Sequence, residues 1–455
     1  MNIFDIIVIG GGPGGYVAAI KGAQEGKKVC LIEQNQLGGV CLNWGCIPTK
    51  ALIKSIEVFE QLQRSEEFGI VGMEQGGARI DMKKLQARKN KIIKNLTGGV
   101  GSLLKSNGVT VVQGKAEILG PHTVRVNYED FRAQAIIIAT GSTPIQLPIS
   151  ITGNRVIISD EALDLTDLPK EMVVIGGGVI GVEFAYIFAK LGIKVTILEM
   201  APQIISMMDA SIIEAVAKEL EKIGIVIYKE AQVLEIKEDQ VFFNYQGKVL
   251  TCKAEKILMA VGRTPCTEGL GLEVLNIEME RRAIRTTSRL QTSIPSIYAI
   301  GDVNGKSMLA HTASTEGIIA IENIFGKEAE MRYDRIPSCI YIHPEIASVG
   351  LTEAEAIKKY GTVKTGIFPM AANGKAMIEG ETQGWVKVIL ENQYQEILGV
   401  HICGPHATDM IAEIVVAMNL EGTGKEVAAS IHPHPTMSES VAEGFHQALG
   451  RAIHI

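Results

Sequence analysis

Residues 5–15 read DIIVIGGGPGG, and residues 171–181 read EMVVIGGGVIG. In each stretch an apolar strand pattern runs into a turn with the spacing Gly-x-Gly-x-x-Gly, which falls at Gly10, Gly12 and Gly15 and again at Gly176, Gly178 and Gly181. The likeness continues through a helical segment and a second apolar strand, so that residues 5–34 and 171–200 align without a gap. The chain therefore contains an internal repeat of strand, glycine turn, helix and strand, which predicts an α/β fold with two Rossmann-like units.

Such a unit binds dinucleotides for a physical reason. The first glycine makes the turn, the second lets a pyrophosphate approach the backbone, and the third lets the helix pack on the strand. The helix N-terminus then offers free N–H groups and a partial positive charge to the phosphates. One such motif is weak, because a glycine turn also precedes many ordinary buried helices, but two matched copies predict two dinucleotide sites.

An acid ends the second strand of each repeat, Glu33 in the first and Glu199 in the second, at the same distance from the first glycine. A carboxylate there accepts hydrogen bonds from ribose hydroxyls. Glu199 would repel a 2′-phosphate, and residues 200–203 contain no Arg to receive one. The second site is therefore expected to prefer NAD over NADP.

The bulk properties are those of a multidomain enzyme. A chain of 455 residues exceeds the size at which single cores usually divide, about 250 residues. A net charge of −7 favours neither nucleic acid nor an anionic membrane as a partner. Residues 1–9 show no export signal, so the cytoplasm is the expected location. Seven scattered Cys do not resemble a secreted disulfide framework, and no His/Cys spacing predicts a metal site.

Residues 38–50, GGVCLNWGCIPTK, place Cys41 and Cys46 with four residues between them. In a regular helix these side chains would lie ~140° apart, so a disulfide requires a distorted first turn, which Gly45 and Pro48 can provide. A strained disulfide near a helix N-terminus is easily reduced, which suits a redox-cycling dithiol. Two unrelated buried thiols remain the alternative from spacing alone.

This segment resembles the active-site signature of the flavin-dependent disulfide reductases, the class I pyridine nucleotide-disulfide oxidoreductases, and among them the dihydrolipoamide dehydrogenases most. Val40 departs from the Thr that is common there. The resemblance implies that Cys41 meets the substrate, that Cys46 faces the flavin, and that Lys50 lies beside the flavin and pairs with Glu183. It also assigns FAD to the first site and NAD to the second, which makes Gly39, Cys41 and Lys50 neighbours of the flavin.

Other segments look like the family's cofactor-binding strands. Residues 135–144 and 257–265 are buried strands that end in turns, and residues 297–303 form an apolar strand that ends in Gly-Asp. The alternative for each is a plain buried strand with a turn. The resemblance implies further FAD contacts at Gly114, Thr140, Gly141, Ser142, Asp302 and Ala310, and further NAD contacts at Val233 and Gly262.

The C-terminal hundred residues change to alternating strands, such as 384–390 and 397–402, followed by helices, which predicts an antiparallel sheet. Residues 431–439 read IHPHPTMSE. A His between prolines sits on a rigid turn, and either a surface His or a held base fits that pattern. The resemblance implies that His434 is the base, that Glu439 orients it across a twofold interface, and that the His434–Pro435 bond is cis. His432 is the rival imidazole.

The expected domains are an FAD-binding domain in two parts, residues 1–150 and 269–335, an NAD-binding domain at 151–268 and an α+β dimerisation domain at 336–455. The resemblance implies a homodimer that oxidises protein-bound dihydrolipoyl groups and reduces NAD⁺ through FAD and the Cys41–Cys46 disulfide. The lipoyl arm would belong to another polypeptide, either the acyltransferase of a 2-oxo acid or acetoin dehydrogenase complex or a glycine-cleavage carrier.

Rival interpretations share much of this pattern. A glutathione reductase would need Arg residues near Glu199, a mercuric reductase would need a Cys pair at the C-terminus, and a large thioredoxin reductase would need redox residues in its tail, but this chain ends AIHI. A non-enzymatic flavoprotein scaffold with a structural disulfide stays open as an alternative of another class.

Overall fold

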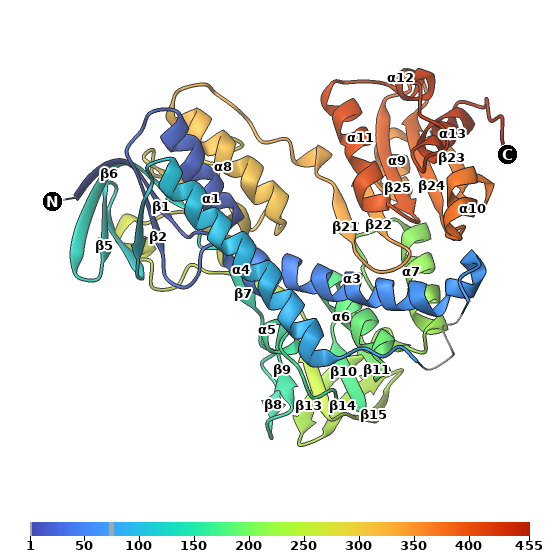
Figure 1. Ribbon diagram of the computed structural model, residues 1–455. Coiled ribbons are helices and arrows are strands. Elements are labelled where there is room, and N and C mark those ends of the chain that lie inside the picture. Colours follow the sequence, from blue (N-terminus) through green and yellow to red (C-terminus); the bar gives the residue numbers. More distant parts are fainter. Residues whose placement is uncertain (1, 72–76) are drawn as a thin grey trace.

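The computed structural model describes residues 2–71 and 77–455. Figure 1 shows the fold as three parts: an N-terminal part at the left, a second part at the bottom and a C-terminal part at the right, with two long helices running between them.

The first part is built on a seven-stranded sheet with the order β3-β2-β1-β6-β5-β4, and β20 pairs with β6. The strands are β1 (Asn2–Ile9), β2 (Val29–Glu33), β3 (Thr110–Gln113), β4 (Ala116–Gly120), β5 (Thr123–Val126), β6 (Glu129–Ile138) and β20 (Ile297–Ala299). Strands β3, β2, β1, β6 and β20 run parallel, while β5 pairs antiparallel with β6 and β4 pairs antiparallel with β5. Because β20 lies far along the chain, the first part is discontinuous in sequence.

Helices cover this sheet and extend from it. Helix α1 (Pro13–Gln24) packs against α8 (Ala310–Ile324), while α3 (Cys46–Gln63) and α4 (Met82–Ser106) are the two long helices that cross in the middle of Figure 1. Ala18 and Ala19 of α1 have no exposed surface, because small side chains are needed where α1 lies on the strands.

The second part repeats the first. Its parallel sheet has the order β12-β11-β10-β16-β9, and a smaller sheet has the order β15-β14-β13-β8. The strands are β8 (Ser150–Ile151), β9 (Val156–Ile157), β10 (Glu171–Ile175), β11 (Lys194–Leu198), β12 (Val226–Tyr228), β13 (Gln232–Lys237), β14 (Gln240–Tyr245), β15 (Lys248–Lys253) and β16 (Lys256–Met259). Helices α5 (Ser159–Ala162), α6 (Val179–Lys190) and α7 (Ala210–Lys222) complete it. Helix, parallel sheet and small sheet form three layers in this part.

A short antiparallel ladder joins the two units. Strand β7 (Ser142–Pro144) pairs with β17 (Arg263–Pro265), so the exits of both nucleotide-binding sheets are hydrogen-bonded to each other. A second short ladder joins β18 (Met279–Glu280) to β19 (Ala283–Ile284).

The C-terminal part is an antiparallel sheet with the order β21-β22-β25-β24-β23. Its strands are β21 (Ser338–Ile340), β22 (Ile346–Gly350), β23 (Val363–Pro369), β24 (Trp385–Glu391) and β25 (Ile397–Cys403), with helices α9 (Glu353–Tyr360), α10 (Gly374–Glu379), α11 (Ala407–Asn419), α12 (Gly424–Ala429) and α13 (Glu439–Ala448). The expected fold class, two Rossmann-like units and an α+β domain, is confirmed.

The cysteine segment differs from the expected single helix with a distorted first turn. A separate short helix, α2 (Gly39–Trp44), carries Cys41, and α3 starts at Cys46. Gly45 between them has φ −141° and ψ −109°, a backbone conformation outside the helical region. The irregularity is therefore a complete break between two helices. Within residues 2–71 and 77–455, none of the helices has both the length and the apolar character that a membrane crossing needs.

Candidate active site

A cavity of about 2300 Å³ lies where the three parts meet. It is lined by both glycine turns and by both cysteines of the α2–α3 segment. Pockets for one small ligand usually measure ~300–1000 Å³. This cavity has room for two large ligands, and it places a dithiol between the two turns.

The first glycine turn has the geometry that the spacing predicts. Gly10 has φ +106°, which side chains rarely adopt, and a Cβ on Gly15 would lie 1.8 Å from the Gly10 carbonyl oxygen. At Gly12, the residue before α1, a Cβ would meet only Gly39, at 3.9 Å. The chain's own packing thus requires glycine at the first and third positions, whereas the second faces the cavity.

The second turn matches it. Gly176 has φ +104°, and a Cβ on Gly181 would lie 2.0 Å from the Gly176 carbonyl oxygen. A Cβ on Gly178 would meet nothing within 4 Å. The start of α6 therefore has the same open space beside its second glycine, Gly178, as the start of α1 has beside Gly12. Each of these two spaces is called a cradle below.

Backbone N–H groups hold the carboxylates of Glu33 and Glu199 in the same way. Glu33 accepts hydrogen bonds from the N–H groups of Gly11 and Asn35, both at 2.6 Å. Glu199 accepts from Gly177 at 2.5 Å and from Ala201 at 2.6 Å. Each oxygen keeps a further lone pair, and both acids line the cavity, so each can accept from a ribose hydroxyl. Two cradles and two oriented carboxylates fit two dinucleotides.

Cys41 and Cys46 are both half-buried thiols on the cavity wall. Cys41 lies within α2, and Cys46 is the first residue of α3, where free N–H groups and the helix dipole favour a thiolate. A hydrogen bond with Cys41, together with the charge of Lys50, lowers the pKa of Cys46 to about 7, against the opposing effect of burial. The same hydrogen bond and burial raise the pKa of Cys41. In the reduced pair, the negative charge therefore resides on Cys46.

Lys50 lies one turn further along α3 and pairs with Glu183 of α6. The Lys50 Nζ lies 2.7 Å and 3.0 Å from the two Glu183 carboxylate oxygens. Glu183 is buried, and it also accepts a hydrogen bond of 2.9 Å from the Tyr341 backbone N–H. The ion pair that the resemblance implies is present, and it joins the two nucleotide-binding units beside the cysteines.

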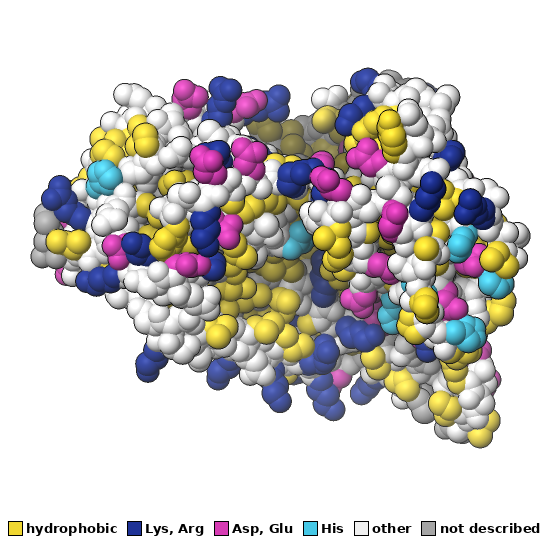
Figure 2. Space-filling view, turned by 90° about the horizontal axis from the view of Figure 1, so that it is seen from above, with side chains coloured by type: hydrophobic (Ala, Val, Ile, Leu, Met, Phe, Trp, Pro, Cys, Tyr) yellow, Lys and Arg dark blue, Asp and Glu magenta, His cyan; other side chains and the backbone are white. Residues whose placement is uncertain are grey.

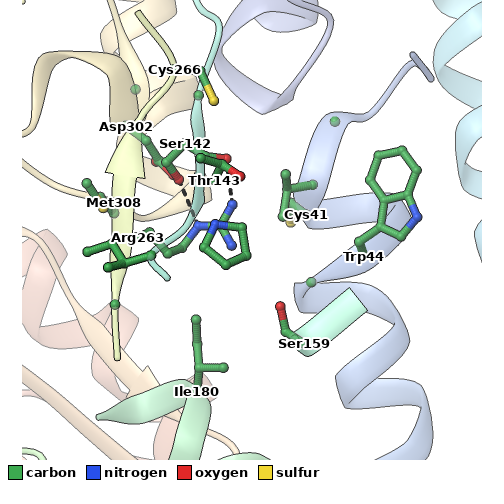
Figure 3. Close-up of a pocket in the computed structure, with 18 of the residues that line it drawn as sticks. Cys41, Trp44, Ser142, Thr143, Ser159, Ile180, Arg263, Cys266, Asp302 and Met308 are labelled. Carbon is green, nitrogen blue, oxygen red and sulfur yellow. Dashed lines mark hydrogen bonds between the residues drawn. The ribbon is translucent and has the colours of Figure 1, made fainter. Parts of the chain in front are cut away.

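Asp302 lies at the start of the turn after β20 and belongs to a hydrogen-bonded chain. The Ser142 hydroxyl donates to Asp302 at 2.5 Å and accepts from Arg263 Nε at 2.7 Å. Figure 3 shows this chain and Cys41 on different walls of the cavity, with Trp44 beside Cys41. The Ser142–Asp302 pair offers polar groups to a ligand that runs from the first glycine turn toward the cysteines.

The remaining predicted cofactor contacts all line the same cavity. These residues are Gly39, Gly114, Thr140, Gly141, Val233, Gly262 and Ala310. A Cβ on Gly141, with φ +72°, would meet nothing within 4 Å. Their individual contacts with FAD or NAD stay predictions.

His434 and Glu439 lie apart from this cavity. The His434 Nδ1 lies 2.9 Å from a Glu439 carboxylate oxygen, and the His434–Pro435 bond is cis. Because a carboxylate only accepts, Nδ1 carries the proton and Nε2 keeps its lone pair. The His434 side chain is 78% exposed, on the C-terminal part where Figure 2 shows several His side chains gathered. Neither residue lines the cavity that holds the cysteines.

The rival His432 is occupied by neighbours. Its Nε2 lies 2.7 Å from a Glu413 carboxylate oxygen, and its Nδ1 lies 3.0 Å from the Ser430 carbonyl oxygen. The hydrogen bond with Glu413 raises the pKa of His432. Both ring nitrogens of His432 have partners, so His434 is the imidazole of the two that keeps a nitrogen available to a substrate.

Sequence reasoning missed two contributors to the site. Arg263 stands in a strand that the sequence singled out, but nothing local indicates that it reaches Ser142. Tyr341 follows β21, and only the tertiary packing of the C-terminal part brings its N–H to Glu183. Lys50 and Tyr341 are far apart in the sequence, so no local pattern links them.

Comparisons with known proteins agree with this geometry. Residues 4–317 match the family model "Pyridine nucleotide-disulphide oxidoreductase", and residues 336–444 match the dimerisation domain of the same family. The chain is 42% identical to a dihydrolipoyl dehydrogenase of Bacillus subtilis (strain 168), with 99% of each chain covered. It is also 42% identical to one of Thermus scotoductus, over 100% of this chain and 99% of the relative. Among solved structures, the HOCl-induced flavoprotein disulfide reductase RclA from Escherichia coli, as its Cu(II) complex, superposes with a TM-score of 0.86 and 30% identity, covering 98% of this chain and 99% of the other.

Proposed function

Because the chain belongs to the pyridine nucleotide-disulphide oxidoreductase family and its activity is that of a dihydrolipoyl dehydrogenase, we propose a division of roles among its residues. FAD and NAD are its cofactors. One observation carries the proposal: Cys41 and Cys46 line the same cavity as both glycine turns, and the Lys50–Glu183 pair lies beside them.

Gly12, Glu33, Ser142 and Asp302 would hold FAD, and Gly178, Glu199 and Val233 would hold NAD. The fit rests on the open cradles and oriented carboxylates at the two turns. FAD held there would supply two-electron redox chemistry between the protein dithiol and NAD⁺. Lys50 supplies a positive charge next to Cys46 and to that electron path.

The thiol–disulfide exchange involves only the two substrate sulfurs and the sulfurs of Cys41 and Cys46. A substrate thiolate attacks the Cys41 sulfur of the Cys41–Cys46 disulfide, the old S–S bond breaks, and Cys46 leaves as a thiolate. The second substrate sulfur then attacks the first, which closes the lipoyl disulfide and releases Cys41. Two electrons pass from the substrate dithiol to the protein disulfide, which becomes the Cys41–Cys46 dithiol. The lowered pKa of Cys46 makes it the better leaving group.

His434 accepts the substrate's thiol proton at Nε2, and Glu439 holds the ring. Because these two residues do not line the cysteine cavity of their own chain, His434 would serve the cavity of a partner subunit. The match of residues 336–444 to the family's dimerisation domain fits a homodimer.

We place the lipoyl arm on a separate acyltransferase or carrier protein, and the enzyme in the cytoplasm.

The first test is an anaerobic titration of the FAD-loaded protein with dihydrolipoamide, followed by NAD⁺. We expect a long-wavelength thiolate-to-flavin absorption band and then NADH. Cys46→Ser should abolish the band, whereas Cys252→Ser, a half-buried thiol outside the cavity, should keep it. A protein that takes electrons from NADH but not from dihydrolipoamide would refute the substrate, and one without either activity would support a scaffold.

A further inference from the structure

We propose that Tyr341 is a positioning residue, which fixes the Lys50 ammonium next to Cys46 and thereby connects the C-terminal part to the dithiol. This inference rests on the proposed roles of Cys46 and Lys50. It adds a residue from the third part of the chain to the cavity.

Three parts of the fold meet at one carboxylate. Lys50 comes from α3, Glu183 comes from α6, and Tyr341 directly follows the edge strand β21. The Glu183 Oε1 accepts from Lys50 Nζ at 3.0 Å and from the Tyr341 N–H at 2.9 Å, while Oε2 accepts from Lys50 at 2.7 Å. Glu183 is 4% exposed, so its position is set by these donors and not by water.

The Tyr341 ring then holds the lysine from a second side. The Lys50 Nζ lies 4.5 Å from the centroid of the ring, within the range of a cation–π contact. A lysine stem has four rotatable carbons, and the Lys50 side chain is 29% exposed, so Glu183 alone would leave the ammonium free to swing about the carboxylate. The Glu183 carboxylate and the Tyr341 ring together hold the Lys50 ammonium from two sides.

The ionisable side chains that face Lys50 and Tyr341 come from all three parts of the fold. Cys41 and Cys46 face it from the α2–α3 segment and Glu183 faces it from α6, while Cys339 and Glu345 act on Tyr341 from the C-terminal part. Burial raises the pKa of Tyr341, so its hydroxyl stays neutral and adds no negative charge beside Lys50. Among the described residues named here, Lys50 is the cation, and its position decides how well a thiolate on Cys46 is stabilised.

The backbone and the ring of Tyr341 have separable roles. Its N–H bond to Glu183 is kept in every variant, because any residue except proline donates it. Only the ring is lost in Tyr341→Leu, whereas Tyr341→Phe keeps it. Tyr360 provides a matched control, because Lys359 lies 5.1 Å from its ring centroid on α9, outside the cavity.

The experiment measures the alkylation rate of Cys46 by iodoacetamide against pH, in protein reduced with dithiothreitol and with Cys41 changed to Ser in every sample. Because other cysteines remain in this Cys41→Ser protein, alkylation is followed at the peptide that contains Cys46, and the Cys41→Ser protein is itself the reference for the midpoint. Tyr341→Leu should raise the midpoint by roughly 0.5–1 pH unit, which slows alkylation below the midpoint by about 3- to 10-fold. Tyr341→Phe and Tyr360→Leu should stay within about 0.2 of the reference.

A double-variant cycle makes the test specific. In a Lys50→Met background, Tyr341→Leu should cause no further change in the midpoint, because the ring acts through the ammonium. An equal change with and without Lys50 would overturn the proposal, and so would an unchanged midpoint in Tyr341→Leu protein that folds. If Tyr341→Leu does not fold, Tyr341→Met takes its place and carries the same expectation.

This readout does not depend on the substrate. Dithiothreitol and iodoacetamide act on the chain's own thiols, so the midpoints can be compared even if dihydrolipoamide proves to be the wrong reductant. Failure of the proposed function appears in the titration with dihydrolipoamide, and failure of the Tyr341 role appears in the midpoints.

Discussion

Lys50 and Glu183 belong to different nucleotide-binding units, and their ammonium and carboxylate groups lie 2.7 Å apart at the dithiol. The pair therefore closes the contact between two sheets and places a positive charge at Cys46. Changes to it should affect both stability and chemistry.

We expect Glu183→Ala to lower the free energy of unfolding by about 2–3 kcal/mol, since it leaves a partly buried ammonium without its carboxylate. Turnover of dihydrolipoamide should fall at least tenfold. Thermal unfolding and steady-state assays check both. Glu171→Ala is the control, because its pair with Lys194 is largely exposed and should contribute under about 1 kcal/mol. Equal losses in the two variants would contradict the importance of burial at Glu183.

The second glycine of each turn should matter for ligands and not for folding. In Gly178→Ala the new methyl group meets nothing within 4 Å, so the melting temperature should stay within a few degrees while the KM for NAD⁺ rises by about tenfold or more. Gly181→Ala should instead destabilise the fold, because its methyl would lie 2.0 Å from the Gly176 carbonyl oxygen. Unchanged NAD⁺ binding in Gly178→Ala would place the pyrophosphate elsewhere.

His434→Gln should reduce dihydrolipoamide oxidation by about 10²- to 10⁴-fold, the usual range for loss of a general base. Electron transfer from NADH to an artificial acceptor should persist, since His434 does not line the cavity. His432→Gln should stay within a few fold of the unaltered protein, because His432 is bound to Glu413.

The same histidine can show whether the site is shared between subunits. Neither Cys41→Ser nor His434→Gln should be active alone, but dimers of one copy of each contain one complete site if His434 acts across the interface. Refolding the two variants together should therefore recover a substantial share of the activity. Recovery of none would mean that His434 serves its own chain or no site at all.

The reduced protein should change its reactivity near neutral pH. Because the pKa of Cys46 is lowered from 9.0 to about 7, the thiolate forms as pH rises through 7, and the thiolate-to-flavin band should grow over the same range. Absorbance of the FAD-loaded, reduced protein against pH measures this. A midpoint near the ordinary 9 would show that Cys41 and Lys50 do not act on Cys46.

A buried cluster should make the contact between α7 and the C-terminal sheet sensitive to acid. The Lys387 Nζ lies 2.8 Å from Asp209, and both side chains are almost fully buried. Although burial opposes it, hydrogen bonds from Lys387, Ser211 and the Glu353 N–H hold the pKa of Asp209 well below its usual 3.8. This stabilisation is therefore present above about pH 4 and is lost as pH falls below it. Asp209→Asn should cost about 3–5 kcal/mol at pH 7 and flatten the acid limb of a stability–pH curve, whereas Asp130→Asn, in an exposed pair with Arg125, should do neither.

The features that the sequence predicts best are local ones. Strand, glycine turn and helix follow one another within residues 5–34 and 171–200, so the order of residues alone is enough to locate both cradles and both acids. The structure bears out the likeness of the two copies. Glu33 and Glu199 each accept one hydrogen bond from a glycine N–H in the turn and one from the N–H two residues further along the chain.

What escaped prediction depends on distant residues. Spacing indicates a distorted helix at Cys41–Cys46, but it does not reveal the complete break that the structure has at Gly45. The Ser142–Asp302 bond and the Tyr341–Glu183 bond each join residues more than a hundred positions apart. Pairs of this kind require the assembled fold, and in this chain they cluster at the junction of its three parts.

The strand order has a consequence for how this protein is made. Strand β20, at residues 297–299, completes a sheet whose other strands end at residue 138. A ribosome releases the chain from the N-terminus, so residues 136–138 of β6 lack their β20 neighbour while the whole second unit emerges. Such an edge readily pairs with other chains. Newly made molecules should therefore need chaperones most before residue 300 has left the exit tunnel, and flavin should bind stably only after that point.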